Sequence, residues 1–317
     1  MSVTIFKNAF GGEEGMVLEQ IIILGAITSF VYALMALGFT LIYGVSGIIN
    51  LAHGAFFVLG AYIFGALSNL FSSFFPAEFL YVVPVLALIV TPILTGIIGS
   101  IFYRLTLHQV LGDQIATMVV SLCGCIIFQQ IIWLVFGSTL AFRFSIPAIL
   151  PGNFTVSNVV IVNAQALAAV ISILLFASLW IFIAKTKSGK AMKALSQDLE
   201  AAMLVGVSVE KMYMLTSAIS AGIASIAAVF YVSMTGAASF YMWLQALALS
   251  FSIVILGGLG SIKGTLIGAL IFGYATTIFS LTLTGAGGLV TSLPFIVMII
   301  VLIIRPKGLF GKRIEME

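Results

Sequence analysis

Long apolar runs make up most of the chain, and charged residues are confined to the segments between them. A transmembrane helix needs about 20 mostly apolar residues. Nine segments meet that requirement: 21–43, 48–70, 81–103, 115–136, 159–184, 212–234, 243–260, 264–283 and 289–304. Two merged segments, or one that re-enters on the same side, would reduce the number to eight. The pattern predicts an all-α polytopic membrane protein with about eight or nine transmembrane helices.

The composition supports this prediction. Of 317 residues, 62% are hydrophobic and 7% are charged, whereas soluble domains carry about 25% charged residues. So few charges could not cover the surface of a water-soluble fold. The net charge is only +3, and no basic stripe interleaved with aromatic residues indicates nucleic-acid binding. The cysteines, Cys123 and Cys125, are two positions apart on a predicted helix and point away from each other, so no disulfide is expected between them.

Lysine and arginine residues set the expected orientation. If nine spans end with a cytoplasmic C-terminus, eleven of the thirteen basic residues lie in cytoplasmic segments, and only Lys7 and Arg143 lie outside. Basic residues are enriched in cytoplasmic loops. We therefore expect an extracytoplasmic segment at 1–20, a transmembrane permease domain at 21–304 with a cytoplasmic loop at 185–211, and a cytoplasmic tail at 305–317.

A glycine-rich stretch, 38–62, joins the first two spans with almost no polar linker. Asn50 and His53 are three residues apart and share one face if the segment is helical, and Gly54 continues that face. Polar groups at membrane depth usually face the bundle interior or a water-filled route. These residues are therefore candidates either to line a substrate route or to hold neighbouring helices together. Gln129 and Gln130, within the fourth span, present the same two alternatives.

Two other classes of protein compete with a permease subunit. Residues 44–47, GVSG, match the GxSG motif of rhomboid intramembrane proteases. A serine nucleophile needs a nearby histidine, but Ser46 has only His53, seven residues on, and His108, in a predicted cytoplasmic loop. A stand-alone secondary carrier is the other alternative. Such carriers commonly use buried charged groups, and no Asp, Glu, Lys or Arg falls well inside a predicted span.

The long charged loop contains an amphipathic pattern. Apolar residues recur at helical spacing within 186–206, namely Met192, Leu195, Leu199 and Met203. This pattern predicts one short helix that suits a groove on a soluble partner. Ser196 is a candidate N-cap for a helix with Asp198 and Glu200 in its first turn.

The same loop lacks a nucleotide site. Residues 188–191, SGKA, have neither the preceding glycine nor the Ser or Thr of a phosphate loop. We expect no metal and no cofactor.

Farther along the chain, Gly260, Gly264 and Gly268 are four residues apart and predict close helix packing.

Four stretches carry a resemblance to a known family. They are YALMALGFTLIYGVSGIINLAHGAFFVLGAY at 32–62, TKSGKAMKALSQDLEAAMLVGVS at 186–208, ILGGLGSIKGTLIGALIFG at 255–273 and RPKGLFG at 305–311. In these stretches, and nearly end to end, the chain resembles the LivH-type permease subunits of branched-chain amino-acid ABC importers. The second stretch holds the EAAxxxG pattern, but Met203 stands where members often carry a basic residue.

The resemblance implies a type II-like ABC importer permease fold in the plasma or inner membrane. The implied partners are a second permease subunit, identical or paralogous, two ABC ATPase subunits and an extracytoplasmic substrate-binding protein. The ATPases would dock on a coupling helix that holds Leu199, Glu200, Ala201, Ala202 and Gly206. They would hydrolyse the ATP, so this chain is not expected to be an enzyme. The implied substrate is a branched-chain or other hydrophobic amino acid, with urea or short-chain amides as the alternative.

Overall fold

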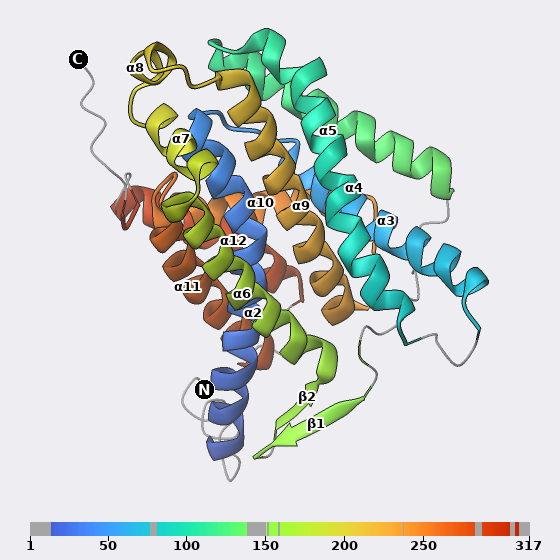
Figure 1. Ribbon diagram of the computed structural model, residues 1–317. Helices are drawn as coiled ribbons and strands as arrows, with labels where there is room; N and C mark the ends of the chain where they lie inside the picture. Colours follow the sequence, from blue (N-terminus) through green and yellow to red (C-terminus); the bar gives the residue numbers. More distant parts are fainter. Residues whose placement is uncertain are drawn as a thin grey trace.

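The computed structural model describes residues 14–76, 81–137, 150, 152–157, 159–236, 238–282, 287–304 and 308–310. Nearly all of them are helical (Figure 1). The long apolar helices are α2 (Glu14–Ser46), α3 (His53–Phe74), α4 (Val83–Leu105), α5 (Gln114–Phe136), α6 (Asn163–Lys185), α9 (Val209–Thr235), α10 (Met242–Gly257), α11 (Ile262–Thr282) and α12 (Gly287–Ile304). The short elements are a 3-10 turn (Leu107–Val110), α7 (Lys187–Leu195), α8 (Leu199–Leu204), β1 (Asn153–Val156) and β2 (Val159–Val162).

Each of the nine predicted segments overlaps one of these apolar helices. Among the described residues, seven helices are long and apolar enough to cross a bilayer. Helix α10 has 16 residues, fewer than a straight crossing requires, and α12 has 18. The polytopic helical architecture predicted from the apolar runs is therefore confirmed.

Two of the predicted transmembrane segments do not begin as helices. The second helix starts at His53, not near residue 48, so Asn50 lies in the preceding turn and shares no helical face with His53. Residues 159–162 form a strand that pairs antiparallel with 153–156, with Asn153 opposite Val162. The sequence VVIV is β-branched throughout, which favours a strand. This hairpin is a local departure from an all-α fold.

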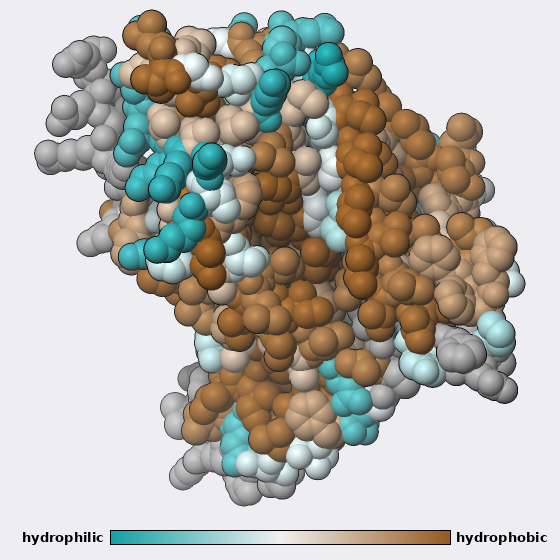
Figure 2. Space-filling model, in the orientation of Figure 1, coloured by the Kyte–Doolittle hydropathy of each residue, from teal (hydrophilic) through white to brown (hydrophobic). Residues whose placement is uncertain are grey.

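Helices α2 and α9 form the centre of the bundle. Helix α2 packs against α6, α9, α10 and α11, while α9 also packs against α3 and α4. Alanines on α9 at positions 221, 224, 227 and 228 are fully buried, and small side chains let membrane helices approach closely. The outer helices α5 and α6 instead leave most of their residues at least partly exposed. Figure 2 shows the resulting broad hydrophobic surface, which suits contact with lipid.

Helices α10 and α11 are held together by glycines. Gly264 lies so close to Gly257 that neither position has room for a Cβ atom. A Cβ atom on Gly268 would lie 2.6 Å from the carbonyl oxygen of Ile253. A Cβ atom on Gly260, in the turn between the helices, would lie 3.1 Å from the Cα atom of Gly44. The close packing predicted from this glycine spacing is confirmed.

All basic residues that the structure describes lie at one end of the bundle, which we call the basic end. Arg104 at the end of α4 lies 3.7 Å from Glu210 at the start of α9. Figure 2 shows hydrophilic residues gathered there over α7, whereas the β-hairpin lies at the opposite end (Figure 1). The remaining basic residues at this end are Lys185, Lys187, Lys190, Lys193, Lys211 and Lys263. Lys7, Arg143 and the basic residues of the tail lie outside the described residues.

Candidate functional site

The predicted amphipathic helix is two short helices. Helix α7 is capped by Thr186, whose hydroxyl accepts a hydrogen bond from Gly189 N at 3.0 Å. Helix α8 is capped by Asp198, whose carboxylate accepts one from Ala201 N at 2.9 Å. The proposed cap, Ser196, is wrong, because its hydroxyl donates to the carbonyl of Lys193. The extended backbone at Asp198 interrupts the helix. Its carboxylate accepts a hydrogen bond from one of the backbone N–H groups that the first turn of α8 leaves without a partner.

The residues predicted for ATPase coupling divide between two faces of α8. Ala202 is 3% exposed and packs into this chain. Leu199, Glu200 and Ala201 are exposed. Met203 is also exposed, as are two apolar residues that the motif did not single out, namely Leu204 and Val205. Helix α8 therefore presents an apolar surface outside the transmembrane bundle.

Gly206 ends α8 in a hydrogen-bonded cap. Its N–H donates to the Met203 carbonyl at 3.0 Å, and the N–H of Val207 donates to the Ala202 carbonyl at 3.0 Å. This is the Schellman pattern, which needs a left-handed residue at the Gly206 position. The φ angle there is +85°, which glycine adopts without steric cost. The chain therefore turns at Gly206 as it leaves α8.

A pocket of about 510 Å³ lies beside this segment at the basic end. We call it the basic-end pocket. Each of the four stretches that carry the family resemblance contributes to its wall: 43–47 from the end of α2, Leu195, Ser196 and Leu199 from α7 and α8, 259–261 between α10 and α11, and Phe310 from the tail. Tyr213 of α9 completes the lining. Sequence reasoning treated the four stretches separately and did not anticipate that they meet.

The tail reaches this pocket through backbone hydrogen bonds. Leu309 N donates to the carbonyl of Leu256 at 2.8 Å, and Phe310 N donates to that of Gly257 at 3.1 Å. Both acceptors lie at the end of α10, where no further turn of helix would use them. The GLF portion of the RPKGLFG stretch thus attaches the tail to the bundle and places Phe310 in the pocket wall.

His53 joins three helices in the interior. It is 1% exposed, and its Nε2 atom lies 2.9 Å from the carbonyl oxygen of Met35 on α2. A carbonyl only accepts hydrogen bonds, so Nε2 donates. The Nδ1 atom of the neutral ring then accepts from the Ser220 hydroxyl of α9 at 3.3 Å. Both ring nitrogens are satisfied, so His53 has the geometry of a residue that holds helices together.

The structure does not assemble the serine–histidine pair of a protease around Ser46. The Ser46 hydroxyl donates to the carbonyl of Ile42 at 2.8 Å. His53 pairs with Ser220, and His108 packs its ring against Tyr103. Ser220 and His53 are both enclosed, with His53 also committed to a backbone carbonyl, so this pair offers no site for a substrate and water.

Asn50 organises the turn before α3. Its Oδ1 atom accepts a hydrogen bond from Ala52 N at 3.0 Å, while its buried Nδ2 atom has no partner among the described residues. The side chain borders a small cavity that Tyr103 also lines, and the Tyr103 hydroxyl is likewise buried without a described partner. Asn50 thus lies near the basic ends of α4 and α9, and its side chain makes contacts different from those of the His53 ring.

Gly54 and Gln129 meet at Trp243. A Cβ atom on Gly54 would collide with the carbonyl of Trp243 on α10. The indole N–H of Trp243 donates a hydrogen bond to Oε1 of Gln129 on α5. Gln130 is exposed on the outer face of α5, beside exposed isoleucines. The structure brings two of the five candidate route residues together, and Trp243 is the residue that sequence reasoning missed.

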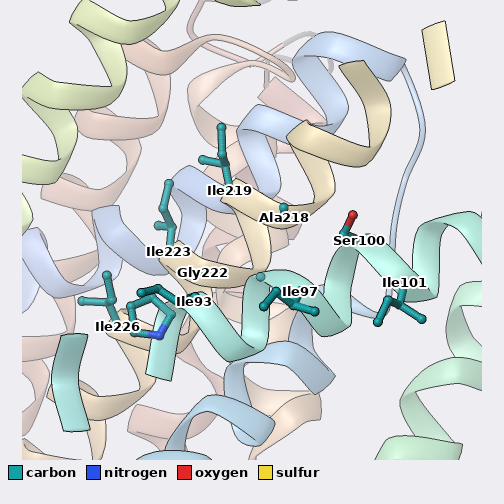
Figure 3. Close-up of a pocket in the computed structure, with 11 residues that line it drawn as sticks. Ile93, Ile97, Ser100, Ile101, Ala218, Ile219, Gly222, Ile223 and Ile226 are labelled. Atoms are coloured by element: carbon teal, nitrogen blue, oxygen red, sulfur yellow. The ribbon is translucent and has the colours of Figure 1, made fainter. Parts of the chain in front are cut away.

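One groove between two transmembrane helices is apolar. It measures about 500 Å³ and runs between α4 and α9. Figure 3 shows Ile93, Ile97 and Ile101 on one ridge and isoleucines 219, 223 and 226 on the other. A charged amino acid would lose its hydration there with almost no polar group to replace it. This groove therefore does not resemble a solute site.

Within the part of the chain that the structure describes, no cluster of His, Cys, Asp and Glu could hold a metal ion. Both cysteines are free, as expected. The buried Cys125 thiol donates to the carbonyl of Leu51.

Comparison with known proteins identifies the family. Residues 21–304 match the family described as the permease component of the branched-chain amino acid transport system. The high-affinity branched-chain amino acid transport system permease protein LivH of Salmonella typhimurium is 30% identical over 288 residues, covering 89% of this chain and 91% of LivH. The corresponding protein BraD of Pseudomonas aeruginosa is 30% identical over 299 residues, covering 92% and 95%.

A solved structure supports the fold. PsaBC from Streptococcus pneumoniae in complex with Fab superposes with a TM-score of 0.50 at 14% sequence identity, covering 97% of each chain. At that identity the similarity concerns the arrangement of helices alone. The match over residues 21–304 and the 30% identity to LivH and BraD show that this multi-pass membrane chain belongs to the family of permease components of branched-chain amino acid transport systems.

Proposed function

We propose that this chain is a permease subunit of an ABC importer that carries branched-chain amino acids into the cell. The observation that carries the proposal is the 30% identity, over about nine-tenths of the chain, to relatives named for branched-chain amino acid transport. The buried, hydrogen-bonded His53 also disfavours the protease alternative. LivH and BraD are named for branched-chain amino acid transport and not for urea or amides, which disfavours the other permease alternative.

The basic end faces the cytoplasm in this proposal. Every Lys and Arg that the structure describes lies there, as expected of cytoplasmic segments. The exposed apolar residues of α8 are placed to enter a groove on an ATPase subunit, where burial would stabilise the complex. The ATPases would hydrolyse ATP, and α8 would receive their movement. An extracytoplasmic binding protein would deliver the amino acid at the opposite end.

The substrate route in this proposal runs beside α3, α5 and α10. Gln130 is a polar residue exposed at membrane depth, a position that suits contact with water or a second subunit better than with lipid. Gln129 is fixed nearby by Trp243, which also packs on Gly54. Asn50 and His53 shape the route by holding α3 in position. The second permease subunit would close the other side.

The test is reconstitution of this chain in lipid vesicles with a second permease subunit, two ATPases and the binding protein. We expect ATP-dependent uptake of radiolabelled leucine, isoleucine and valine, and no uptake when the ATPases are omitted. Uptake of urea or acetamide without uptake of leucine would overturn the substrate assignment. Uptake of leucine by this chain without ATPases would identify a secondary carrier instead.

A further inference from the structure

Two buried polar groups line the same small cavity near the basic end. Asn50 is 1% exposed and Tyr103 is 3% exposed. The Nδ2 atom of Asn50 and the hydroxyl of Tyr103 have no hydrogen-bond partner among the described residues, and both residues line the cavity. Buried polar groups are normally hydrogen-bonded, because burying one without a partner costs free energy. Both groups therefore need a partner inside the cavity.

The orientation of the Asn50 amide follows from its other hydrogen bond. Its Oδ1 atom accepts from Ala52 N at 3.0 Å. A backbone N–H only donates, so it must meet the oxygen and not the nitrogen of the amide. A flip of the amide would leave Ala52 N facing a second donor. The Nδ2 group therefore remains a donor that the turn itself cannot satisfy.

The cavity wall also presents acceptors. On α9, the Thr216 hydroxyl donates to the carbonyl of Met212 at 2.7 Å, and the Ser217 hydroxyl donates to the carbonyl of Gly99 on α4 at 2.9 Å. Each hydroxyl oxygen keeps lone pairs that can accept a hydrogen bond, and both residues line the cavity. The wall thus combines two donors without a partner and two acceptor oxygens.

The size and the chemistry of the cavity fit a single water molecule. Its volume is about 10 Å³, and a cavity needs about 10–15 Å³ to hold one water. A buried water both donates and accepts, and typically makes about three hydrogen bonds. A cation would be repelled by the two donors, an anion by the two acceptor oxygens, and a solute of several heavy atoms would not fit.

We propose that one buried water molecule bridges Asn50 Nδ2 and the Tyr103 hydroxyl, and that it connects the turn at residues 47–52 to α4 and α9. The turn is already bonded directly to α5. Leu51 N donates to the Ser121 hydroxyl at 3.1 Å, and the Cys125 thiol donates to the Leu51 carbonyl. Among the described residues, Asn50 makes no direct hydrogen bond to α4. The water supplies that connection.

Tyr103 is well placed to hold such a water. Its ring makes edge contacts with the rings of Tyr213 on α9 and His108 in the 3-10 turn, each at a centroid distance of 6.2 Å. The ring is thereby fixed where these elements meet α4. Ser46 and Tyr213 line both this cavity and the basic-end pocket, so the water has a short path for exchange with solvent. The proposal holds whichever solute the chain transports.

The first test is a structure of the assembled complex in lipid nanodiscs, at a resolution that shows ordered water. We expect one density peak about 2.7–3.2 Å from both Asn50 Nδ2 and the Tyr103 hydroxyl oxygen. A direct contact between the two side chains, or a cavity without density, would overturn the proposal. A bound group larger than water would overturn the choice of ligand.

The second test is a double-mutant cycle on the melting temperature of the same complex. Tyr103→Phe removes the hydroxyl, and Asn50→Ser removes Nδ2 but keeps an oxygen that can accept from Ala52 N. Each change should lower the melting temperature by about 2–4 °C, because it leaves a buried group unpaired. The double variant should fall no further than the lower single variant, since either change breaks the same bridge.

Tyr241→Phe is the matched control, because it removes a hydroxyl from a tyrosine that is 59% exposed. It should leave the melting temperature unchanged. Shifts of the two single variants that simply add in the double variant would show that the two groups act separately. That result, or single variants that melt like the wild type, would overturn the bridge.

The third test measures the connection from α4 to the turn by hydrogen–deuterium exchange. In Tyr103→Phe, the backbone N–H groups of residues 47–52 should exchange at least twofold faster, because the turn loses its link to α4. Exchange in the hairpin at 153–162 and in Tyr241→Phe should match the wild type. Unchanged exchange of the turn would refute the connection. Failed leucine uptake by the wild type would refute the proposed function and leave these three tests unaffected.

Discussion

Leu204 provides the sharpest test of whether α8 docks on an ATPase subunit, as proposed. It is 87% exposed, at the last residue of α8 and outside the transmembrane bundle. Burying a leucine side chain fully stabilises a complex by about 1.5–3 kcal/mol. Leu204→Asp removes that contribution and adds a carboxylate that must be desolvated. Because about 1.4 kcal/mol corresponds to a tenfold change, affinity for the ATPase should fall more than tenfold.

The measurement is a titration of the solubilised permease with purified ATPase, followed by binding-protein-stimulated ATP hydrolysis in vesicles. Val160→Asp is the control, because Val160 is also an exposed apolar residue but lies on the hairpin at the opposite end. It should leave ATPase affinity unchanged. If Leu204→Asp inserts normally and retains both wild-type affinity and wild-type stimulation, α8 is not the docking element.

Three further predictions follow from the same structure. Ala201→Trp should weaken ATPase binding but preserve the melting temperature, because Ala201 is exposed. Ala202→Trp should instead lower the melting temperature, since overpacking a buried site costs about 1–3 kcal/mol. The opposite pattern would show that Ala202, and not Ala201, faces the ATPase. His53→Ala should lower the melting temperature because it leaves buried groups unpaired, at about 1–3 kcal/mol each; lost leucine uptake at an unchanged melting temperature would instead place His53 on the route. In a cysteine-free background, Phe154→Cys should react with an impermeant thiol reagent outside the cell and Lys187→Cys only after permeabilisation; labelling of both from one side would refute the orientation.

The transmembrane architecture could be predicted because hydropathy determines it locally. Each apolar segment became a helix, and errors arose only at the ends. The segment at 159–184 begins with a strand because β-branched valines and isoleucine favour it, although they are equally apolar. The predicted helix near residue 48 begins later because Asn50 forms a local turn. Hydropathy reports neither the strand preference of residues 159–162 nor the turn formed by Asn50.

The segment at 186–206 shows a different limit of prediction from the sequence. Met192, Leu195, Leu199 and Met203 continue one helical period through the sequence, yet the chain breaks between α7 and α8. Asp198 is the signal that could have revealed the break, because Asp is a strong N-cap residue. The burial of Ala202 could not be predicted, since the EAAxxxG pattern does not state which alanine faces the protein. The contact of Trp243 with Gln129 depends on tertiary packing alone.

The glycine contacts of α10 and α11 have a mechanical consequence. Where two backbones touch at Gly257 and Gly264, no long side chain remains between them to change rotamer and absorb a displacement. The pair should tilt as one rigid lever rather than slide. Its turn rests on Gly44 of α2, and the tail is attached to the end of α10. A displacement of the α10–α11 turn at the basic end should therefore produce a displacement of similar size at the opposite end of α11.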